Sequence, residues 1–402
     1  MVSSRRKVLV IGMADSVHLG RWISQFVDQP IDFTLFPSSP HRHIHSMLKR
    51  CIDDERSEMT IRIQPTLMKW LAFPLSVLDL LFWNAFRAFL LRRVIRKTKF
   101  DLIHVLELQH AGYLLLDTEL SPQLPKVFVT TWGSDIYWFR QFPKHKERIV
   151  ELLGIAKIFS AECDRDIKIV RELGYTGQVK PVIPVNGGLD VQCLPTNMRP
   201  PSQRQKIIVK GYTGFVGRAQ IAIDALEGVI DELEGYEVLI YSASLKARLR
   251  ALRLKIKHGI SVRIVRKRTS HADMLKLFSE SRVYLGISLS DGISTSLLEA
   301  MATGCYPVQT NTGCACEWVT ESSGSLVQPD NTQAISAQLR EALTNDERVN
   351  EAAKVNSGNV RSRASAAIVI RKRVFFVPMF FGNCLISRSF WLCWHRVPKA
   401  FV

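Results

Sequence analysis

Several features that define whole classes of protein are missing from this 402-residue sequence or scarce in it. Its eight cysteines are scattered, which argues against a small disulfide-rich domain. No Gly-x-Gly-x-x-Gly follows the first apolar run, so a nicotinamide-dependent oxidoreductase is disfavoured. No dense basic stretch interleaved with aromatic residues stands out along the chain, and we expect no nucleic-acid partner.

Signs of a metal site or a targeting segment are also missing. Cys305, Cys314 and Cys316 are three thiols without a second Cys-x-x-Cys pair, so we predict no zinc site and no metal. The histidines of 41–45 fall in a polar turn and are interpreted as a loop. The first apolar run is only as long as a strand and no small-residue cleavage site follows it, so we expect no signal peptide and a cytoplasmic location.

Positive charge is abundant, with a net charge of +17 and a pI near 9.7, which favours an anionic partner. About half of the excess lies in residues 351–402. The stretch 66–97 is apolar and aromatic and then strongly basic, and Asp79, Asn84 and Arg87 interrupt it. This pattern predicts either an interfacial helix on the inner face of the plasma membrane or an amphipathic helix buried in the first domain.

Short apolar runs alternate with helical patterns, which predicts parallel sheets covered by helices on both faces. In the first half of the chain the predicted strands are 7–12, 32–36, 101–105, 126–131, 157–160 and 179–182. In the second half they are 206–211, 237–241, 261–265, 282–288 and 306–309. The helices predicted between and after these later strands are 218–232, 244–256, 270–279, 296–303 and 331–345.

A proline-rich polar stretch at 194–205 predicts a linker between two such sheets. We therefore expect an α/β protein with Rossmann-like domains at 1–193 and 206–350 and an atypical basic and apolar tail at 351–402. Within this tail, 362–376 is a candidate helix returning to the first domain, and the end beyond it is expected to be disordered. Ligands of such sheets bind at the carboxyl ends of the strands, so we expect one in the cleft between the domains.

The most informative segment is 282–317, where a buried strand leads into a polar loop and a short helix. Asp291 lies in the loop and Glu299 in the helix. Free amides at a helix start favour a diphosphate, and a carboxylate accepts two hydrogen bonds, which suits the diol of a ribose. The alternative is structural, because Ser296 and Glu299 form an S-x-x-E capping box.

This segment resembles the nucleotide-sugar site of the family-4 retaining glycosyltransferases, which have the GT-B fold. Many members carry Glu-Gly-Phe-Gly and then Glu-Ala-Met-Ala-x-Gly-x-Pro-Val-Val. Here Asp291 replaces the first Glu, and EAMATGCYPV begins at Glu299 with one inserted residue. The resemblance implies that Glu299 binds the ribose and that Asp291 lies near the transferred sugar. It also implies contacts to sugar and phosphates from the loop residues Gly292, Ile293, Ser294 and Thr295.

A diphosphate leaving group also needs fixed cations, because negative charge builds on it as the glycosidic bond breaks. The family supplies an Arg and a Lys after the first strand of the second domain. Here Lys210 and Arg218 flank a glycine-containing loop in the opposite order. We expect both cations to face the diphosphate, with a solvated surface position as the alternative. The resemblance implies no obligate metal and no cofactor.

The first domain is similar to the family as well. Its first loop resembles the Ser-x-His-x-x-Arg-Trp opening of polysaccharide-assembly members, and the substrate-binding residues expected there are Gly12, Asp15, Ser16 and His18. The sequence TTWGSD at 130–135 stands where many members read His-Gly-x-Asp, so Trp132 replaces the His. Asp135 remains a catalytic candidate on the acceptor side. His104 and His110 flank the neighbouring strand end, where a lone His is more often structural.

We therefore expect a GT-B glycosyltransferase of the hexosyltransferase type, with a UDP or GDP sugar as donor and retention of configuration. The expected acceptor is a hydroxyl of a lipid-linked or growing surface polysaccharide, with an anionic membrane surface as a further partner. Two alternatives stay open. One is a catalytically decayed scaffold that still binds nucleotide sugars, and the other is a nucleotide-sugar epimerase on the same fold.

Overall fold

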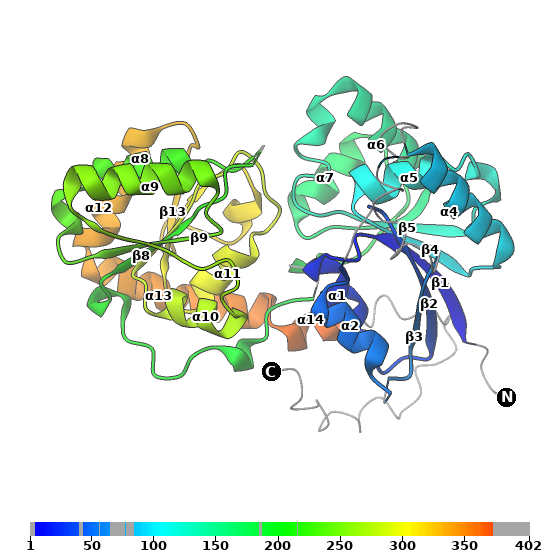
Figure 1. Cartoon of the computed structure of the whole chain (residues 1–402), viewed down its shortest axis with the longest axis horizontal. Helices are drawn as coiled ribbons and strands as arrows, with labels where there is room; N and C mark the ends of the chain where they lie inside the picture. Colours follow the sequence, from blue (N-terminus) through cyan, green and yellow to red (C-terminus); the bar gives the residue numbers. More distant parts are fainter. Residues whose placement is uncertain are drawn as a thin grey trace. The chain divides into compact units, whose positions relative to one another are not determined.

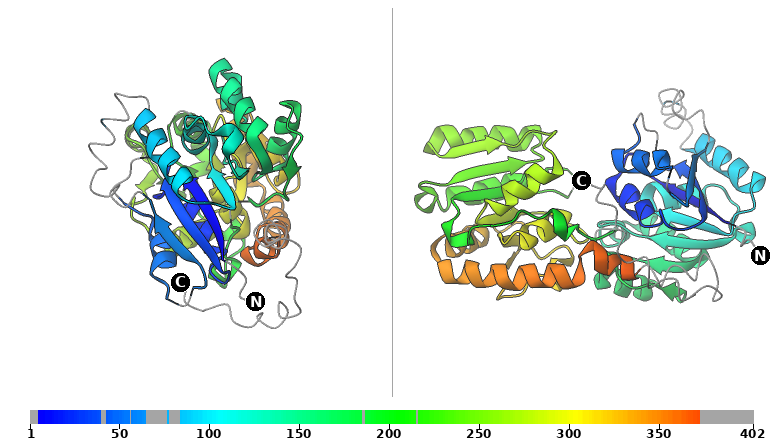
Figure 2. Two further views of the ribbon diagram at one scale, coloured as in Figure 1. Left: turned by 90° about the vertical axis from the view of Figure 1, so that its right-hand side faces the viewer. Right: turned by 90° about the horizontal axis from the view of Figure 1, so that it is seen from below.

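The computed structural model describes residues 5–39, 43–55, 57–64, 77, 84–184, 187–214 and 216–372. The chain divides into two compact units, Met1–Gly187 with Val369–Val402 (unit 1) and Gly188–Ile368 (unit 2). Each unit is a parallel sheet with helices packed on both faces (Figures 1 and 2). The predicted α/β class with two doubly wound sheets is therefore confirmed.

Unit 1 contains a seven-stranded parallel sheet in the order β3-β2-β1-β4-β5-β6-β7. The interior strand β1 contains an uninterrupted apolar run at residues 8–11, which is fully buried between the helix layers. The strand order reverses between β1 and β4, where sheets of this type bind ligands. The strands are β1 (Arg6–Gly12), β2 (Ile31–Pro37), β3 (Thr60–Ile63), β4 (Leu102–Leu106), β5 (Lys126–Thr130), β6 (Ala156–Ser160) and β7 (Gln178–Val179).

The helices of unit 1 cover two apolar cores, to which alternate residues of β1 contribute. Val369 of α14 packs into one of these cores, so the chain returns to unit 1 within the segment 362–376. The rest of the tail lies outside the described residues. The helices are α1 (Val17–Ser24), α2 (Ser46–Asp53), α4 (Ala85–Lys97), η2 (Leu108–Gly112), α5 (Tyr113–Leu116), η3 (Ser121–Gln123), η4 (Phe139–Gln141), α6 (Pro143–Ile155), α7 (Asp164–Glu172) and α14 (Ala366–Lys372).

His104 belongs to the core of unit 1 rather than to a site. Its ring is fully buried, stacks on Phe128 at 4.1 Å between centroids and contacts Trp22 edge-on. Its Nε2 lies 2.9 Å from Oγ1 of Thr130. Burial lowers the pKa of His104 to about 3, because the charged form loses its hydration.

This buried imidazole predicts an acid-sensitive stability. The unfolded chain takes up a proton near pH 6.5 and the folded chain does not, so the free energy of unfolding falls as the pH drops below 6.5. We expect a fall of about 1.4 kcal/mol per pH unit from this residue. Urea unfolding of wild type and His104→Phe at pH 7 and pH 5 measures it. An identical pH dependence in the two proteins would contradict the prediction.

Unit 2 repeats the architecture with a six-stranded parallel sheet in the order β10-β9-β8-β11-β12-β13. Its strands are β8 (Lys206–Lys210), β9 (Glu237–Tyr241), β10 (Ser261–Ile264), β11 (Val283–Gly286), β12 (Tyr306–Thr310) and β13 (Ser325–Val327). Its helices are η6 (Val191–Cys193), η7 (Pro201–Gln203), α8 (Ala219–Glu227), η8 (Asp231–Leu233), α9 (Leu245–His258), α10 (His271–Ser279), α11 (Thr295–Ala302), η9 (Cys314–Glu317), α12 (Thr332–Thr344) and α13 (Asp346–Arg363).

The stretch 194–205 packs onto unit 2 instead of standing apart as a linker. Buried Arg204 donates from Nη1 to the carbonyls of Ser281 and Thr303, both at 3.0 Å. Buried Arg282 donates from Nη1 to the carbonyl of Ser202 at 3.1 Å. The boundary between the units consequently falls at residues 187 and 188, and α13 belongs to unit 2 although part of it was expected in the tail.

Of the stretch 66–97, the structure describes Val77 and residues 84–97. Here α4 packs Ala88 and Leu91 into the core of unit 1, and Phe89 is its exposed apolar side chain at 57%. The described part therefore follows the alternative of a buried amphipathic helix. None of the helices in the described ranges is long and apolar enough to cross a membrane.

Candidate functional site

The two loops expected to hold the donor lie side by side in unit 2. They follow β8 and β11, which are parallel neighbours, so both loops emerge at the same edge of the sheet. The Arg218 amide donates to the Ile287 carbonyl at 3.0 Å, and the Leu289 amide donates to the Val216 carbonyl at 2.7 Å. These backbone bonds fix the loop of residues 211–218 against the loop that carries Asp291.

Lys210 and Asp291 meet at this edge, as an ion pair of 3.0 Å between Nζ and Oδ2. The Lys210 ammonium also donates to Oγ of Ser294 at 3.4 Å. Burial lowers the pKa of Lys210, but the charge and hydrogen bond of Asp291, together with Tyr284 and Tyr212, outweigh that effect and the net pKa is raised. A cation therefore lies next to Ser294, the residue just before α11.

Ser294 is the N-cap of α11, and its side chain makes no capping hydrogen bond within the described structure. The first-turn amides of α11 are therefore not satisfied by their own cap, and the helix dipole adds positive potential at the same place. Together with Lys210, this end of α11 has the chemistry that an anionic group requires.

Glu299 does not cap its helix, so the capping-box alternative is wrong. The cap is Ser294, and Ser296 lies inside α11. The Glu299 side chain is only 8% exposed, and its Oε1 lies 2.7 Å from Nε2 of His271. The carboxylate is thus held by a side chain from the neighbouring helix α10.

His271 is a site residue that the sequence analysis did not identify. It is the first residue of α10, whose N-cap Ser270 accepts the Asp273 amide at 3.1 Å, and its side chain is 54% exposed. Its local sequence signals only a helix start, because its partner Glu299 lies 28 residues further along the chain.

The other residues expected to contact the donor differ in which of their atoms a ligand can reach. Ile293 is 3% exposed, so its side chain belongs to the core and only its backbone is available to a ligand. The Gly292 carbonyl accepts the Cys314 amide at 3.2 Å. A Cβ on Gly313 would lie 3.2 Å from the carbonyls of Asp291 and Gly292, so glycine allows these two loops to pack. Thr295, the first residue of α11, is partly exposed.

Arg218 is the N-cap of α8 and is half-buried, with Nη1 donating to the Gly217 carbonyl at 2.9 Å. The glycines of its loop are explained by packing within unit 2. A Cβ on Gly214 or Gly217 would collide with Tyr212, and a Cβ on Gly211 would lie 2.7 Å from the Ala243 Cα.

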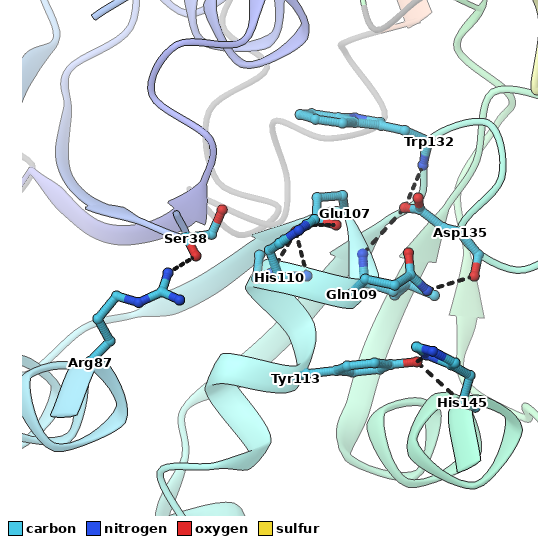
Figure 3. Close-up of polar contacts among 11 residues, drawn as sticks. Ser38, Arg87, Glu107, Gln109, His110, Tyr113, Trp132, Asp135 and His145 are labelled. Atoms are coloured by element: carbon cyan, nitrogen blue, oxygen red, sulfur yellow. Dashed lines mark hydrogen bonds and ion pairs between the residues drawn. The ribbon is translucent and has the colours of Figure 1, made fainter. Parts of the chain in front are cut away.

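Unit 1 gathers polar side chains at the carboxyl ends of β4 and β5 (Figure 3). Asp135 is buried, and its Oδ2 accepts the amides of Trp132 at 2.8 Å and Leu108 at 3.2 Å. Burial raises the pKa of Asp135, and the negative charge of Glu107 raises it further. The Asp135 side chain therefore links the loop after β5, which contains Trp132, to the loop after β4, which contains Leu108.

Glu107 and His110 form a second polar pair at this edge. Glu107 has a positive φ of 76°, and its Oε1 accepts the amides of His110 at 2.8 Å and Ala111 at 2.6 Å. Its Oε2 lies 3.2 Å from Nδ1 of His110. This hydrogen bond raises the pKa of His110, whose side chain is 58% exposed.

The first turn of α1 brings His18 close to Trp132, the residue that replaces the family's His. The His18 ring lies 5.1 Å from the Trp132 ring. Ser16 is the N-cap of α1 and accepts the His18 amide at 3.1 Å, so its side chain has a structural role. Gly12 lies against Leu106, where a Cβ would approach to 3.3 Å, and Asp15 is exposed.

Comparisons with known proteins agree with this arrangement. Residues 7–160 match a family described as glycosyl transferase 4-like, and residues 210–345 match glycosyl transferases group 1. No curated protein matches the sequence.

Solved structures with the same fold are similar over nearly the whole chain. Sucrose-phosphate synthase from Thermosynechococcus elongatus has a TM-score of 0.68 at 14% identity, covering 94% of this chain and 99% of its own. Alr3699/HepE from Anabaena, solved with UDP and glucose, has a TM-score of 0.66 at 14% identity, covering 93% and 99%. The lipopolysaccharide outer core galactosyltransferase WaaB has 0.61 at 13%, covering 93% and 99%. The chain belongs to the glycosyltransferases of the GT-B type.

The His271–Glu299 contact predicts that His271 orients the carboxylate. We expect His271→Ala to weaken nucleoside diphosphate binding about three- to tenfold, because a hydrogen bond that only positions the binding group contributes about 1 kcal/mol. His271→Gln keeps a nitrogen donor and should restore most of the affinity. Calorimetric titration of both variants, alone and combined with Glu299→Gln, tests this, because coupled residues give non-additive losses. Strictly additive losses would show that His271 acts independently of Glu299.

Proposed function

We propose that this protein transfers a hexosyl group from a UDP or GDP sugar to a hydroxyl acceptor with retention of configuration. The observation that carries the proposal is the group at one edge of the unit 2 sheet: the Lys210–Asp291 ion pair, the start of α11 and the buried Glu299. The fold is shared with HepE, which was solved with UDP-glucose.

In the proposed mechanism each residue has a role that follows from its charge and position. Glu299 accepts the two ribose hydroxyls, and the α11 amides bind the diphosphate. Lys210 and Arg218 stabilise the charge that develops on the leaving diphosphate, the role that a metal has in other transferases. Asp291 contacts the transferred sugar. The leaving phosphate itself accepts the proton of the acceptor hydroxyl, on the same face of the sugar.

The proposed acceptor is a lipid-linked or growing surface polysaccharide at the inner face of the plasma membrane. In unit 1, Asp135, His18 and the Glu107–His110 pair offer the hydrogen-bonding groups that a sugar acceptor needs.

Release of nucleoside diphosphate from a panel of UDP and GDP sugars, with and without a bacterial glycolipid extract, tests the proposal. We expect one donor to be consumed faster when the extract is present, with an α-linked product from an α-linked donor. Inversion of configuration would contradict the retaining mechanism. Consumption of no donor by a folded protein would contradict transfer.

A catalytically decayed binding protein is the second candidate. Trp132 in place of the family's His favours it, because an indole N–H neither gives up nor takes up a proton near neutral pH and cannot serve in acid–base chemistry. Saturable binding of a nucleotide sugar without turnover would establish this candidate.

A further inference from the structure

The outer face of α9 is apolar although it faces solvent. Leu245, Leu249, Leu252 and Ile256 are 72%, 60%, 53% and 76% exposed. Their spacings of four, three and four residues place them in one narrow stripe along the helix. The opposite side of α9 packs against unit 2 through Ala247, Ala251 and Leu254, which are buried. The helix lies beside α8 at the surface of the unit (Figure 1).

Basic side chains flank this stripe on both sides. Lys246 and Arg253 lie on one side of it and Arg248 and Lys255 on the other, and all four are exposed. The helix contains no acidic residue. The remaining cations lie closer to the body of the unit, where Arg250 pairs with Asp224 and Lys257 with Glu227.

We propose that α9 is a membrane-docking helix that lies in the surface of an anionic lipid bilayer. The four apolar side chains enter the boundary between headgroups and acyl chains, and the flanking Lys and Arg reach up to lipid phosphates. This inference deepens the proposed function, because it places the enzyme where a lipid-linked acceptor is presented. It also moves the membrane contact from the stretch 66–97 to unit 2.

The basic residues beside the stripe favour an anionic bilayer over a second copy of the protein or a nucleic acid as its partner. A second copy of α9 would place like charges opposite one another, because the positions on both sides of the stripe are all Lys or Arg. A nucleic-acid backbone would match the charge but leave four large apolar side chains without a partner. An anionic lipid surface matches both features.

Vesicle co-sedimentation of the full chain tests the proposal. We expect the wild type to bind vesicles of phosphatidylglycerol and phosphatidylcholine at least tenfold more tightly than phosphatidylcholine alone. The double substitution Leu249→Gln and Leu252→Gln should reduce this binding at least tenfold, and Arg248→Gln with Lys255→Gln should reduce it and its salt sensitivity. The control is Val355→Gln, which changes an exposed apolar residue of α13 in the same unit and should bind as the wild type does.

The outcomes distinguish a failure of the membrane-docking proposal from a failure of the proposed donor site. Equal vesicle binding by the wild type and the Leu249/Leu252 variant would overturn the proposal, as would no binding by a wild type that still binds nucleoside diphosphate. Concentration-dependent dimers that the same variant abolishes, without vesicle binding, would assign the stripe to a protein interface instead. Vesicle binding that depends on the stripe in a protein that binds no nucleotide would keep this inference and overturn the proposed function.

Discussion

Lys210→Met is expected to lower kcat about 10²- to 10³-fold, the usual cost of removing one fixed donor from a developing negative charge. The ammonium lies 3.0 Å from Asp291 and 3.4 Å from Ser294, at the start of α11, where the leaving diphosphate is proposed to lie. Methionine preserves most of the side-chain volume, so the change removes the charge with little effect on packing. Asp291 is 27% exposed, so water can solvate the carboxylate that is left unpaired.

Lys206→Met is the matched control for this experiment. Lys206 begins the same strand β8 and has its own ion pair of 2.6 Å with Glu280, but it lies at the opposite edge of the sheet. Steady-state kinetics with the consumed donor should show a loss of kcat for Lys210→Met and almost none for Lys206→Met. Similar losses in both variants would mean that the effect comes from strand stability and not from charge at the site.

Glu299→Gln is expected to weaken nucleoside diphosphate binding about 10- to 100-fold, because hydrogen bonds to a charged group contribute about 1.5–3 kcal/mol. The amide keeps the size of the side chain and one acceptor oxygen, but it cannot accept two hydrogen bonds from a ribose diol with both oxygens. The single oxygen of the glutamine amide can still accept a hydrogen bond from His271.

Calorimetric titration with a nucleoside diphosphate and its 2′-deoxy form measures this effect. The variant should lose more affinity for the ribonucleotide than for the deoxynucleotide, which keeps only the 3′-hydroxyl as a partner for this side chain. Exposed Glu321→Gln in the same unit serves as the control and should change neither affinity. An equal loss for both ligands in Glu299→Gln would contradict contact between this carboxylate and the ribose.

The parts of the site that are local in sequence were predictable. The run from Glu299 to Gly304 indicated a short helix, and Gly304 ends α11 with a φ of +83°, which glycine adopts without strain. The cations Lys210 and Arg218 were expected after β8 from the resemblance to the family, which has an Arg and a Lys at this place. The ion pair of Lys210 with Asp291 joins residues 81 apart, and only the parallel pairing of β8 with β11 brings them together.

Other features depended on tertiary contacts that no local pattern encodes. The prolines of 194–205 indicated an irregular segment. They did not indicate that Arg204 would be buried in unit 2, where it donates to two backbone carbonyls. The strand β13 has three residues, too short for a periodic signal. The spacing of the α9 apolar stripe is visible in the sequence, but such a stripe normally faces a core. Only the fold shows that the core-facing side of α9 consists of Ala247, Ala251 and Leu254.

The most direct test of the donor site is a thermal-shift panel of purified protein with UDP, GDP, ADP and CMP, with Glu299→Ala measured alongside. A ligand that binds only the folded state stabilises it by about 2.7 kcal/mol at one hundred times its Kd. We predict that one nucleoside diphosphate raises the Tm of the wild type and that the variant loses most of this shift. A folded wild type that responds to none of the four nucleotides, or a variant that keeps the full shift, would contradict it.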